Sequence, residues 1–249
     1  MRPIFSTFRR LTLVVTAQAA IAFIAPAAVA QTATTATTVP ASASSSAAST
    51  QASPKVKITT SMGDIIVELY PDKAPKTVEN FLQYVKDKHY DGTVFHRVIS
   101  TFMVQGGGFD AKYEQKKTRP NIAHEGREAL AKGLKNTIGT LAMARTGDPQ
   151  SASSQFFINV VDNAFLDPTL IPDGDPVLNF SYQGQTYPST PRAKLLGAGQ
   201  LWGYTVFGKV IKGMDVVEKI KAVPTAAGGP FPTDVPKTQV SIVTATLVK

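Results

Sequence analysis

The sequence predicts a mainly β domain whose strands close into an antiparallel barrel, with helices over its ends. About seven or eight short segments alternate apolar and polar side chains, as half-buried strands do. Two segments show the apolar spacing of amphipathic helices, and they do not alternate with the strands, which argues against a doubly wound parallel sheet. Closure of the sheet would hide strand edges that otherwise invite aggregation.

The first predicted elements are a hairpin and a helix. Residues 56–60 and 65–70 have strand character and flank a turn signal at 61–64. Pro75 then suits the first turn of a helix. The apolar residues that follow recur at the helical spacing i, i+3, i+4 and i+7: Val78, Phe81, Leu82 and Val85. The segment is therefore expected to be an amphipathic helix with one apolar stripe.

The central stretch, residues 95–105, predicts two strands that carry a polar pair within an apolar surface. Strand alternation places Arg97 on the face opposite His96, and it places Met103 and Gln105 together on one face. If the two strands pair, Arg97, Met103 and Gln105 converge. An arginine and an amide beside Phe and Met side chains form the layout of a small-ligand site. On this stretch alone, an ordinary strand pair with a surface arginine remains the alternative.

The remaining segments complete the predicted barrel. Further strands are expected at 138–145, 154–160, 203–211 and 239–248. Met214, Val217 and Ile220 mark a second short helix. Residues 110–137 are polar and irregular and predict a long loop with one helical turn, while residues 223–236 are crowded with Pro and Gly and contain no predicted strand.

Residues 168–201 interrupt this pattern. They are rich in Pro, Gly and small polar residues and show no strand or helix periodicity. A structureless run of this length is unusual inside a compact domain and indicates a functional or family-specific insertion.

Residues 1–30 have the features of a cleavable signal peptide. Arginines precede an uncharged apolar stretch, and Ala-Val-Ala ending at Ala30 forms a small-x-small cleavage site. The apolar stretch, residues 11–25, is shorter than the roughly 20 residues that a membrane-spanning helix needs, so a permanent anchor is the weaker interpretation. We expect cleavage after Ala30 and no stable membrane span in the mature chain.

Residues 31–54 are almost entirely Ala, Thr, Ser and Gln. Such a segment buries too little apolar surface to offset the entropy of ordering, so it is predicted to be a disordered tether. The folded domain is then expected at 55–249.

The net charge and the cysteine content limit the classes of function that fit this chain. The formal net charge of the full chain is +8, and removal of the signal peptide takes away positive charges and no acids. A mildly basic chain without basic runs interleaved with aromatics gives no indication of nucleic-acid binding. The chain has no cysteine, so an exported form must rely on its core rather than on disulfides.

Several motifs in order carry a family resemblance. They are Pro75-Lys76-Thr77-Val78-Glu79-Asn80-Phe81, Phe95-His96-Arg97-Val98-Ile99 with Phe102-Met103-Val104-Gln105-Gly106-Gly107, Gly139-Thr140-Leu141-Ala142-Met143-Ala144, Ser154-Gln155-Phe156-Phe157-Ile158 and Val206-Phe207-Gly208-Lys209-Val210. Outside 168–201, residues 55–249 resemble the cyclophilins, which are peptidyl-prolyl cis-trans isomerases. The resemblance implies an eight-stranded barrel capped by two α-helices. With the signal peptide, the chain resembles the exported bacterial type and is expected in the periplasm.

The resemblance also implies site residues. The implied catalytic residues are Arg97, Gln105 and Phe102. The implied substrate-binding residues are His96, Met103, Ala144, Arg145, Phe157, Phe165, Leu166 and Tyr204. Ala144 and Arg145 match a strand that pairs with substrate through its main chain. Phe165 and Tyr204 stand where tryptophan and histidine are usual, and both replacements resemble bacterial members. Because Phe lacks the indole N–H donor, we expect weak cyclosporin binding at most.

The expected activity is rotation of X–Pro bonds in exported polypeptides, assisting folding, with Arg97 stabilising the twisted amide. The expected partners are proline-containing unfolded or flexible polypeptides, and the protein is expected to be a monomer. No cofactor is expected, and His89, His96 and His124 lack the spacing of metal ligands. One alternative is a periplasmic chaperone or Pro-peptide-binding scaffold with little turnover. Another is a pseudo-enzyme whose pocket is covered by residues 168–201.

Overall fold

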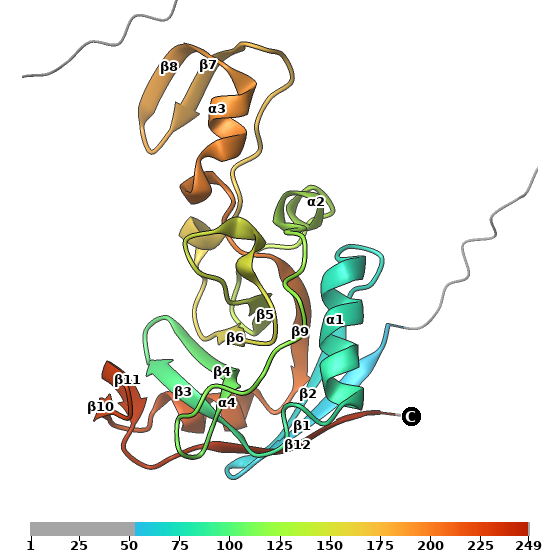
Figure 1. The fold of residues 1–249 in the computed structure, drawn as a ribbon, viewed down its shortest axis with the longest axis vertical. Helices are drawn as coiled ribbons and strands as arrows, with labels where there is room; N and C mark the ends of the chain where they lie inside the picture. Colours follow the sequence, from blue (N-terminus) through green and yellow to red (C-terminus); the bar gives the residue numbers. More distant parts are fainter. Residues whose placement is uncertain (1–52, 249) are drawn as a thin grey trace, which may run out of the picture. The chain divides into compact units, whose positions relative to one another are not determined.

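A computed structural model describes residues 53–248. The predicted signal peptide, its cleavage site and residues 31–52 of the predicted tether lie outside the described residues. Eight strands form a closed antiparallel barrel (Figure 1), as predicted. In barrel order they are β1 (Lys55–Thr60), β12 (Ser241–Leu247), β3 (Thr93–Ile99), β4 (Met103–Asp110), β6 (Phe156–Asn159), β5 (Thr140–Met143), β9 (Val206–Lys212) and β2 (Gly63–Leu69).

Two helices pack their apolar stripes into the core of the barrel. They are α1 (Pro75–Lys86) and α4 (Met214–Lys221). In α1, Val78, Phe81 and Val85 are buried as the helical spacing predicts, and Leu82 packs partly buried against the same core. Two further helices are short: α2 (Gly126–Ala131) lies in the loop where one helical turn was predicted, and α3 (Arg192–Gly197) lies in a segment predicted to have no helix. Among residues 53–248, no helix is long and apolar enough to cross a membrane.

The N-terminus of α1 is capped by a residue distant in sequence. Ala74, at the N-cap position, offers no side-chain hydrogen bond. The buried carboxylate of Glu125 instead accepts the main-chain N–H groups of Lys76 (3.0 Å) and Thr77 (2.8 Å) and the Thr77 hydroxyl (2.7 Å). These contacts satisfy donors that the helix itself leaves unpaired, at the positive end of its dipole. Glu125 thereby ties the long loop before α2 to the N-terminus of α1.

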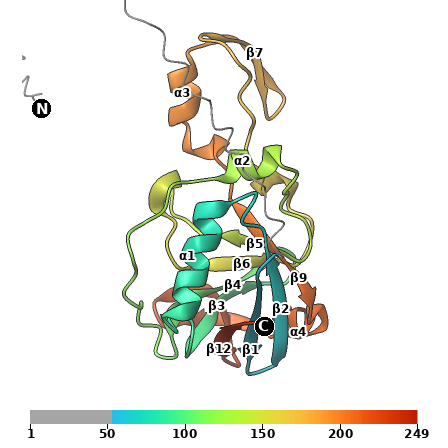
Figure 2. The ribbon, with the colours of Figure 1, turned by 90° about the vertical axis from the view of Figure 1, so that its right-hand side faces the viewer.

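Residues 168–201 are not structureless, so that prediction is wrong. They form β7 (Val177–Tyr182), β8 (Gln185–Thr190), α3 and a 3-10 turn, η3 (Gly199–Leu201). Their core is separate from that of the barrel and consists of Val177, Phe180, Leu195 and Leu201. These residues meet only in three dimensions and show no period along the chain, which is why the sequence did not reveal them. In Figures 1 and 2 the insertion projects from one end of the barrel.

The segment rich in Pro and Gly near the C-terminus also contains strands that were not predicted. β10 (Thr225–Gly228) and β11 (Phe231–Pro236) form a two-stranded antiparallel hairpin. The hairpin lies beside β3 (Figure 1). Alternation fails as a guide here because the ribbon is short and irregular in register, and most of its side chains remain exposed.

Candidate active site

Three neighbouring strands bring the predicted polar pair together with an apolar wall. β3 and β4 pair with Arg97 opposite Gln105 and Ile99 opposite Met103. β4 and β6 pair with Gln105 opposite Phe157. Residues opposite each other in adjacent antiparallel strands point to the same face. Arg97, Gln105 and Phe157 therefore form one row, which confirms the predicted convergence of Arg97, Met103 and Gln105.

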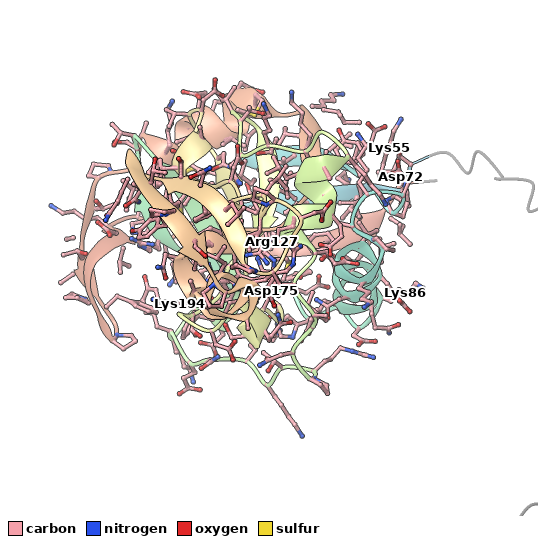
Figure 3. The ribbon with its side chains drawn as sticks, turned by 90° about the horizontal axis from the view of Figure 1, so that it is seen from above. Lys55, Asp72, Lys86, Arg127, Asp175 and Lys194 are labelled. Atoms are coloured by element: carbon pink, nitrogen blue, oxygen red, sulfur yellow. The ribbon has the colours of Figure 1, made fainter. Side chains whose placement is uncertain are left out.

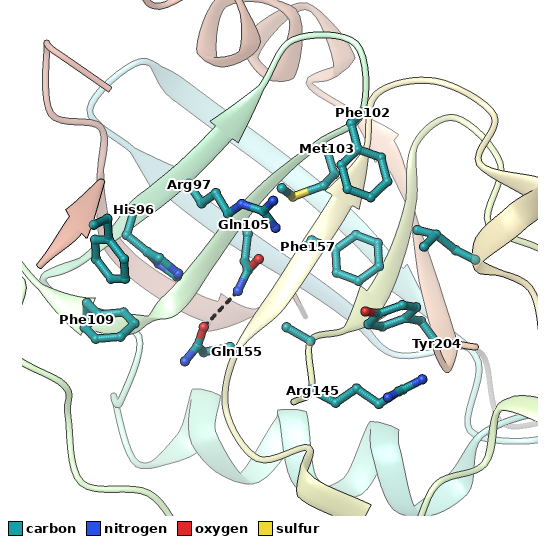
Figure 4. Close-up of a pocket in the computed structure, with 13 residues that line it drawn as sticks. His96, Arg97, Phe102, Met103, Gln105, Phe109, Arg145, Gln155, Phe157 and Tyr204 are labelled. Carbon is teal, nitrogen blue, oxygen red and sulfur yellow. Dashed lines mark hydrogen bonds between the residues drawn. The ribbon is translucent and has the colours of Figure 1, made fainter. Parts of the chain in front are cut away.

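These three side chains line a cavity of about 360 Å³ (Figure 4). Of the predicted site residues, it is lined by His96, Arg97, Phe102, Met103, Gln105, Ala144, Arg145, Phe157, Leu166 and Tyr204. Three lining residues were not predicted: Phe109, Gln155 and Phe231. The cavity thus collects residues from across the barrel and from the β10–β11 hairpin.

His96 reaches the cavity through an irregularity in β3. Strand alternation predicted it on the face opposite Arg97, yet both side chains line the cavity. The register shifts between Phe95, paired with Gly106, and Arg97, paired with Gln105. Two residues of β3 thus oppose one residue of β4, which is a β-bulge, and bulges redirect a side chain. The predicted opposite placement of His96 and Arg97 is wrong for this reason.

The Arg97 guanidinium is held from one side. Its Nε lies 3.4 Å from the Asp234 carboxylate of β11, and the Arg97 side chain is 44% exposed. Within residues 53–248, Nη1 and Nη2 of Arg97 make no hydrogen bond. Guanidinium is charged at any physiological pH. The arrangement leaves a cation with free N–H donors at the edge of the cavity.

Gln105 is oriented by a second amide. Its Nε2 donates to Oε1 of Gln155 over 2.9 Å, the dashed line in Figure 4. A glutamine side chain carries two N–H donors and a carbonyl acceptor. One donor is used in this bond, so the other donor and the carbonyl of Gln105 remain for a ligand.

One end of the cavity is an apolar pocket. It is walled by Phe102, Met103, Phe157 and Leu166. The Tyr204 ring meets Phe157 edge to face, with centroids 5.5 Å apart. The Arg145 guanidinium lies over Tyr204 at 4.8 Å and donates from Nε to the Gly203 carbonyl over 2.8 Å. The Arg145 side chain therefore supports the wall of the pocket and is not free to pair with a ligand.

The other end of the cavity is aromatic. The His96 ring lies 4.7 Å from the ring of Phe109 and 5.3 Å from the ring of Phe231, measured between centroids. Burial lowers the pKa of His96 from its ordinary value of 6.5 to about 4. The imidazole is therefore neutral at neutral pH, and this end of the cavity carries no charge of its own.

Comparison with known proteins identifies the family. Residues 55–247 match the family described as "Cyclophilin type peptidyl-prolyl cis-trans isomerase/CLD". The chain is a cyclophilin.

Curated relatives agree with this assignment. Peptidyl-prolyl cis-trans isomerase B of Escherichia coli (strain K12) is 47% identical over 192 residues, which are 77% of this chain and 98% of the relative. A peptidyl-prolyl cis-trans isomerase of Streptomyces antibioticus is 48% identical over 172 residues, 69% of this chain and 86% of the relative. A peptidyl-prolyl cis-trans isomerase of Acinetobacter baylyi is 45% identical over 196 residues, which are 79% of this chain and 86% of the relative. The predicted enzyme class, a peptidyl-prolyl cis-trans isomerase, is confirmed.

Phe165 is the one predicted site residue outside the cavity lining of this cyclophilin. It lies on a 3-10 turn, η2 (Ala164–Leu166), and is 75% exposed. Its ring stacks on Phe102, with centroids 5.6 Å apart. Phe165 therefore flanks the apolar pocket from outside and extends its rim.

Two of the three missed residues carried a signal in the sequence. Alternation places Phe109 on the face of Gln105, four residues earlier, and Gln155 on the face of Phe157. Phe231 carried none, because it lies among Pro and Gly residues in a segment with no predicted strand.

The cavity of this cyclophilin is not covered by its insertion. Residues 168–201 are all described, and none of them lines the cavity. The structure therefore gives no support to the pseudo-enzyme alternative, in which this segment packs across Phe102 and Phe157.

Proposed function

We propose that this cyclophilin accelerates X–Pro rotation in exported polypeptides, and so assists their folding, through stabilisation of the twisted proline amide by Arg97. The single observation that carries the proposal is the position of Arg97. Its guanidinium stands at the edge of an apolar pocket, its terminal N–H groups have no partner among residues 53–248, and Gln105 lies directly across from it on β4. A proline ring in the pocket would present its amide to these donors.

The chemistry requires no bond to be made or broken at the peptide. Rotation about X–Pro is slow because the C–N bond has partial double-bond character, with a barrier of roughly 20 kcal/mol. At the twisted geometry conjugation is lost, and the proline nitrogen becomes pyramidal with a localised lone pair. An N–H donor aimed at that nitrogen stabilises the twisted state more than either planar isomer. Such differential binding lowers the barrier.

One hydrogen bond does not supply the whole effect. A rate gain of about 10⁵ requires roughly 7 kcal/mol off the barrier. A hydrogen bond from a charged donor contributes only about 1.5–3 kcal/mol. The remainder is assigned to positioning: the apolar pocket holds the proline ring, while Gln105 and the strand end at Ala144 and Arg145 hold the flanking peptide groups.

The proposed setting is the periplasm. Support comes from the sequence of residues 1–30, with its basic start, apolar stretch and cleavage site at Ala30. Expression of the full chain followed by cell fractionation and intact-mass measurement tests this. The expected result is a periplasmic protein that begins at Gln31. A cytoplasmic protein of full-length mass contradicts the proposal.

The catalytic role is tested by Arg97→Ala. We expect kcat/KM for an Ala-Pro peptide to fall at least about tenfold, because one charged donor to the transition state is lost. Magnetisation-transfer NMR measures the cis/trans exchange rate without a coupling protease. The variant removes the partner of the Asp234 carboxylate. The double variant Arg97→Ala, Asp234→Ala therefore serves as the control for the effect of that unpaired negative charge.

Arg97→Lys keeps the charge but not the planar array of donors, and an intermediate rate is expected. Circular dichroism checks that each variant is folded. Turnover close to wild type in a folded Arg97→Ala protein refutes the assigned role.

A further inference from the structure

The β10–β11 hairpin gives the cleft a second apolar end. The cavity runs from the pocket at Phe157 to three rings at its far end, those of His96, Phe109 and Phe231. We name these three rings the aromatic platform. Figure 4 shows His96 and Phe109 on one side of Arg97 and Gln105, with Phe157 on the other. The polar groups thus separate two apolar surfaces within one cleft.

The platform is held in place by packing from several elements. The rings of Phe109 and Phe231 meet edge to face at 5.0 Å between centroids, and Tyr113 approaches Phe231 at 6.1 Å. At the tip of the hairpin, Gly229 has a φ of +52°, and a Cβ added there would lie 2.7 Å from the Tyr113 ring. The tip of the hairpin therefore packs closely against Tyr113. Packing against neighbouring rings fixes the position of Phe231.

Part of the ring surface of the platform is left uncovered by the protein. Phe109 and Phe231 are only half-buried, although each already contacts other rings. Their remaining surface faces a cavity that contains the proposed catalytic Arg97 and Gln105. Half-buried rings beside a binding cleft gain stability when a ligand covers them.

We propose that the aromatic platform is a second substrate subsite, which binds a large apolar or aromatic side chain a few residues away from the proline. An aromatic side chain fits best, because ring pairs gain stability in edge-to-face and offset geometries beyond the area that they bury. The inference rests on the proposed function, since it requires the peptide to lie along this cleft.

The spacing sets the range of positions to search. Met103, in the apolar pocket, and Phe109, in the platform, lie six positions apart on β4. A strand rises about 3.4 Å per residue, but β4 is not fully extended here, because Gly106 and Asp110, four positions apart, pair with Phe95 and Thr93, which lie only two positions apart on β3. An extended peptide with its proline in the pocket therefore reaches the platform within about four residues.

The test uses peptides of Ala and Gly around one Ala-Pro bond. A single Phe is placed in turn at each position from four residues before the proline to four after it. Dissociation constants come from NMR shift titration, and exchange rates from magnetisation transfer on the same samples. Wild type is expected to bind at least one Phe-containing peptide about fivefold more tightly than the parent peptide. This gain should be lost in Phe231→Ala and kept in Phe231→Tyr, which retains the ring.

The control is Tyr187→Ala, which removes an exposed ring from the insertion, outside the cleft. The gain is expected to persist in this variant. If wild type shows no gain for any Phe position, or if the gain survives in Phe231→Ala, the subsite is refuted. Binding without any acceleration of exchange would instead refute the proposed function and leave the subsite standing, so the two failures are distinguishable.

Discussion

The insertion at 168–201 and the β10–β11 hairpin look alike in the sequence and have opposite relations to the active site. Both are rich in Pro and Gly, and both contain a two-stranded antiparallel hairpin. The insertion buries its apolar side chains against one another, as with Phe180 and Leu195, and none of its residues lines the cavity. The β10–β11 hairpin packs Phe231 against rings of the barrel and lines the cavity.

The difference follows from how much core each segment builds by itself. An isolated two-stranded hairpin is marginally stable at best. The insertion adds α3 and a 3-10 turn, which supply Leu195 and Leu201 to its own small core. The β10–β11 hairpin has no such helix and must pack on the barrel, which makes it a wall of the cleft. A short segment that packs on the barrel can therefore matter more to the site than a longer segment with its own core.

The largest effect is expected at Gly203, where the insertion rejoins the barrel. Gly203 has a φ of +58°, and an added Cβ would lie 2.4 Å from the main-chain nitrogen of Pro168 and 2.5 Å from the carbonyl oxygen of Leu166. Main-chain atoms cannot rotate away, so Gly203→Ala is expected to cost about 3 kcal/mol or more of unfolding free energy. Activity should fall too, because Leu166 and Tyr204 are walls of the pocket. Urea unfolding and exchange NMR measure the two effects.

Gly229→Ala is the matched variant on the β10–β11 hairpin. Gly229 also has a positive φ, but its added Cβ would meet the side chain of Tyr113, which can move. The expected loss of unfolding free energy is about 1–2 kcal/mol. A larger loss at Gly229 than at Gly203 would show that the hairpin, and not the join of the insertion, is the more tightly fixed region.

Acid is expected to lower the stability of the fold through two histidines, one next to each of the two regions. His96 packs against the β10–β11 hairpin, and His124 contacts the Gly203 carbonyl with Nε2 at 3.2 Å. Burial lowers the pKa of each to about 4 from an ordinary value of 6.5. Below about pH 6.5 the unfolded chain binds protons that the folded chain does not, so stability falls as pH drops from about 6.5 to about 4. For His96 the loss is at most about 3 kcal/mol.

Urea unfolding at pH 7, 5.5 and 4 measures this dependence. His96→Phe keeps an aromatic ring on the platform and removes the titration of this side chain, so it should flatten the pH profile. His124→Gln should flatten it by a similar amount, because the pKa of His124 is also lowered to about 4. A wild-type profile that is flat between pH 7 and 4 would contradict both assignments.

Sequence periodicity predicts the centre of the site and fails at its margins. Alternation along regular strands correctly places Met103 and Gln105 on one face of β4. It also places Phe157, which lines the cavity, on the face of β6 opposite its buried neighbours Phe156 and Ile158. It fails at His96, because a bulge adds one residue to β3 and shifts the alternation. It also fails at Phe231, whose place depends on packing against distant rings.

The insertion shows a second limit of the sequence. Val177 and Phe180 meet Leu195 and Leu201 only after the chain has turned back on itself. No window of the sequence contains a periodic pattern that would report this contact. The eight strands of the barrel could therefore be predicted in outline, whereas both added hairpins could not.

The smallest effect is expected from removal of the insertion. Its two ends already lie together, because the Tyr204 N–H donates to the Leu166 carbonyl over 2.9 Å. Several contacts to the barrel would be lost, among them the edge-to-face packing of the His124 and Trp202 rings, with centroids 5.4 Å apart. The others are the Arg127 Nε bond to the Thr169 carbonyl (3.1 Å), the Arg127 guanidinium over the Trp202 ring (4.3 Å) and the Arg145 Nη2 bond to the Gly199 carbonyl (3.3 Å). Arg127, near the centre of Figure 3, would regain water.

Replacement of residues 168–202 by two glycines therefore retains the pocket. The bond from Arg145 Nε to the Gly203 carbonyl and the stacking on Tyr204 do not involve the removed residues. We expect kcat/KM for an Ala-Pro peptide to change less than about threefold, since no group that faces the proline is lost. Because the insertion has its own core, the barrel should still unfold cooperatively, at a slightly lower temperature. A loss of more than about tenfold in a folded variant would mean that the insertion acts on the cleft and that its separation from the site is only apparent.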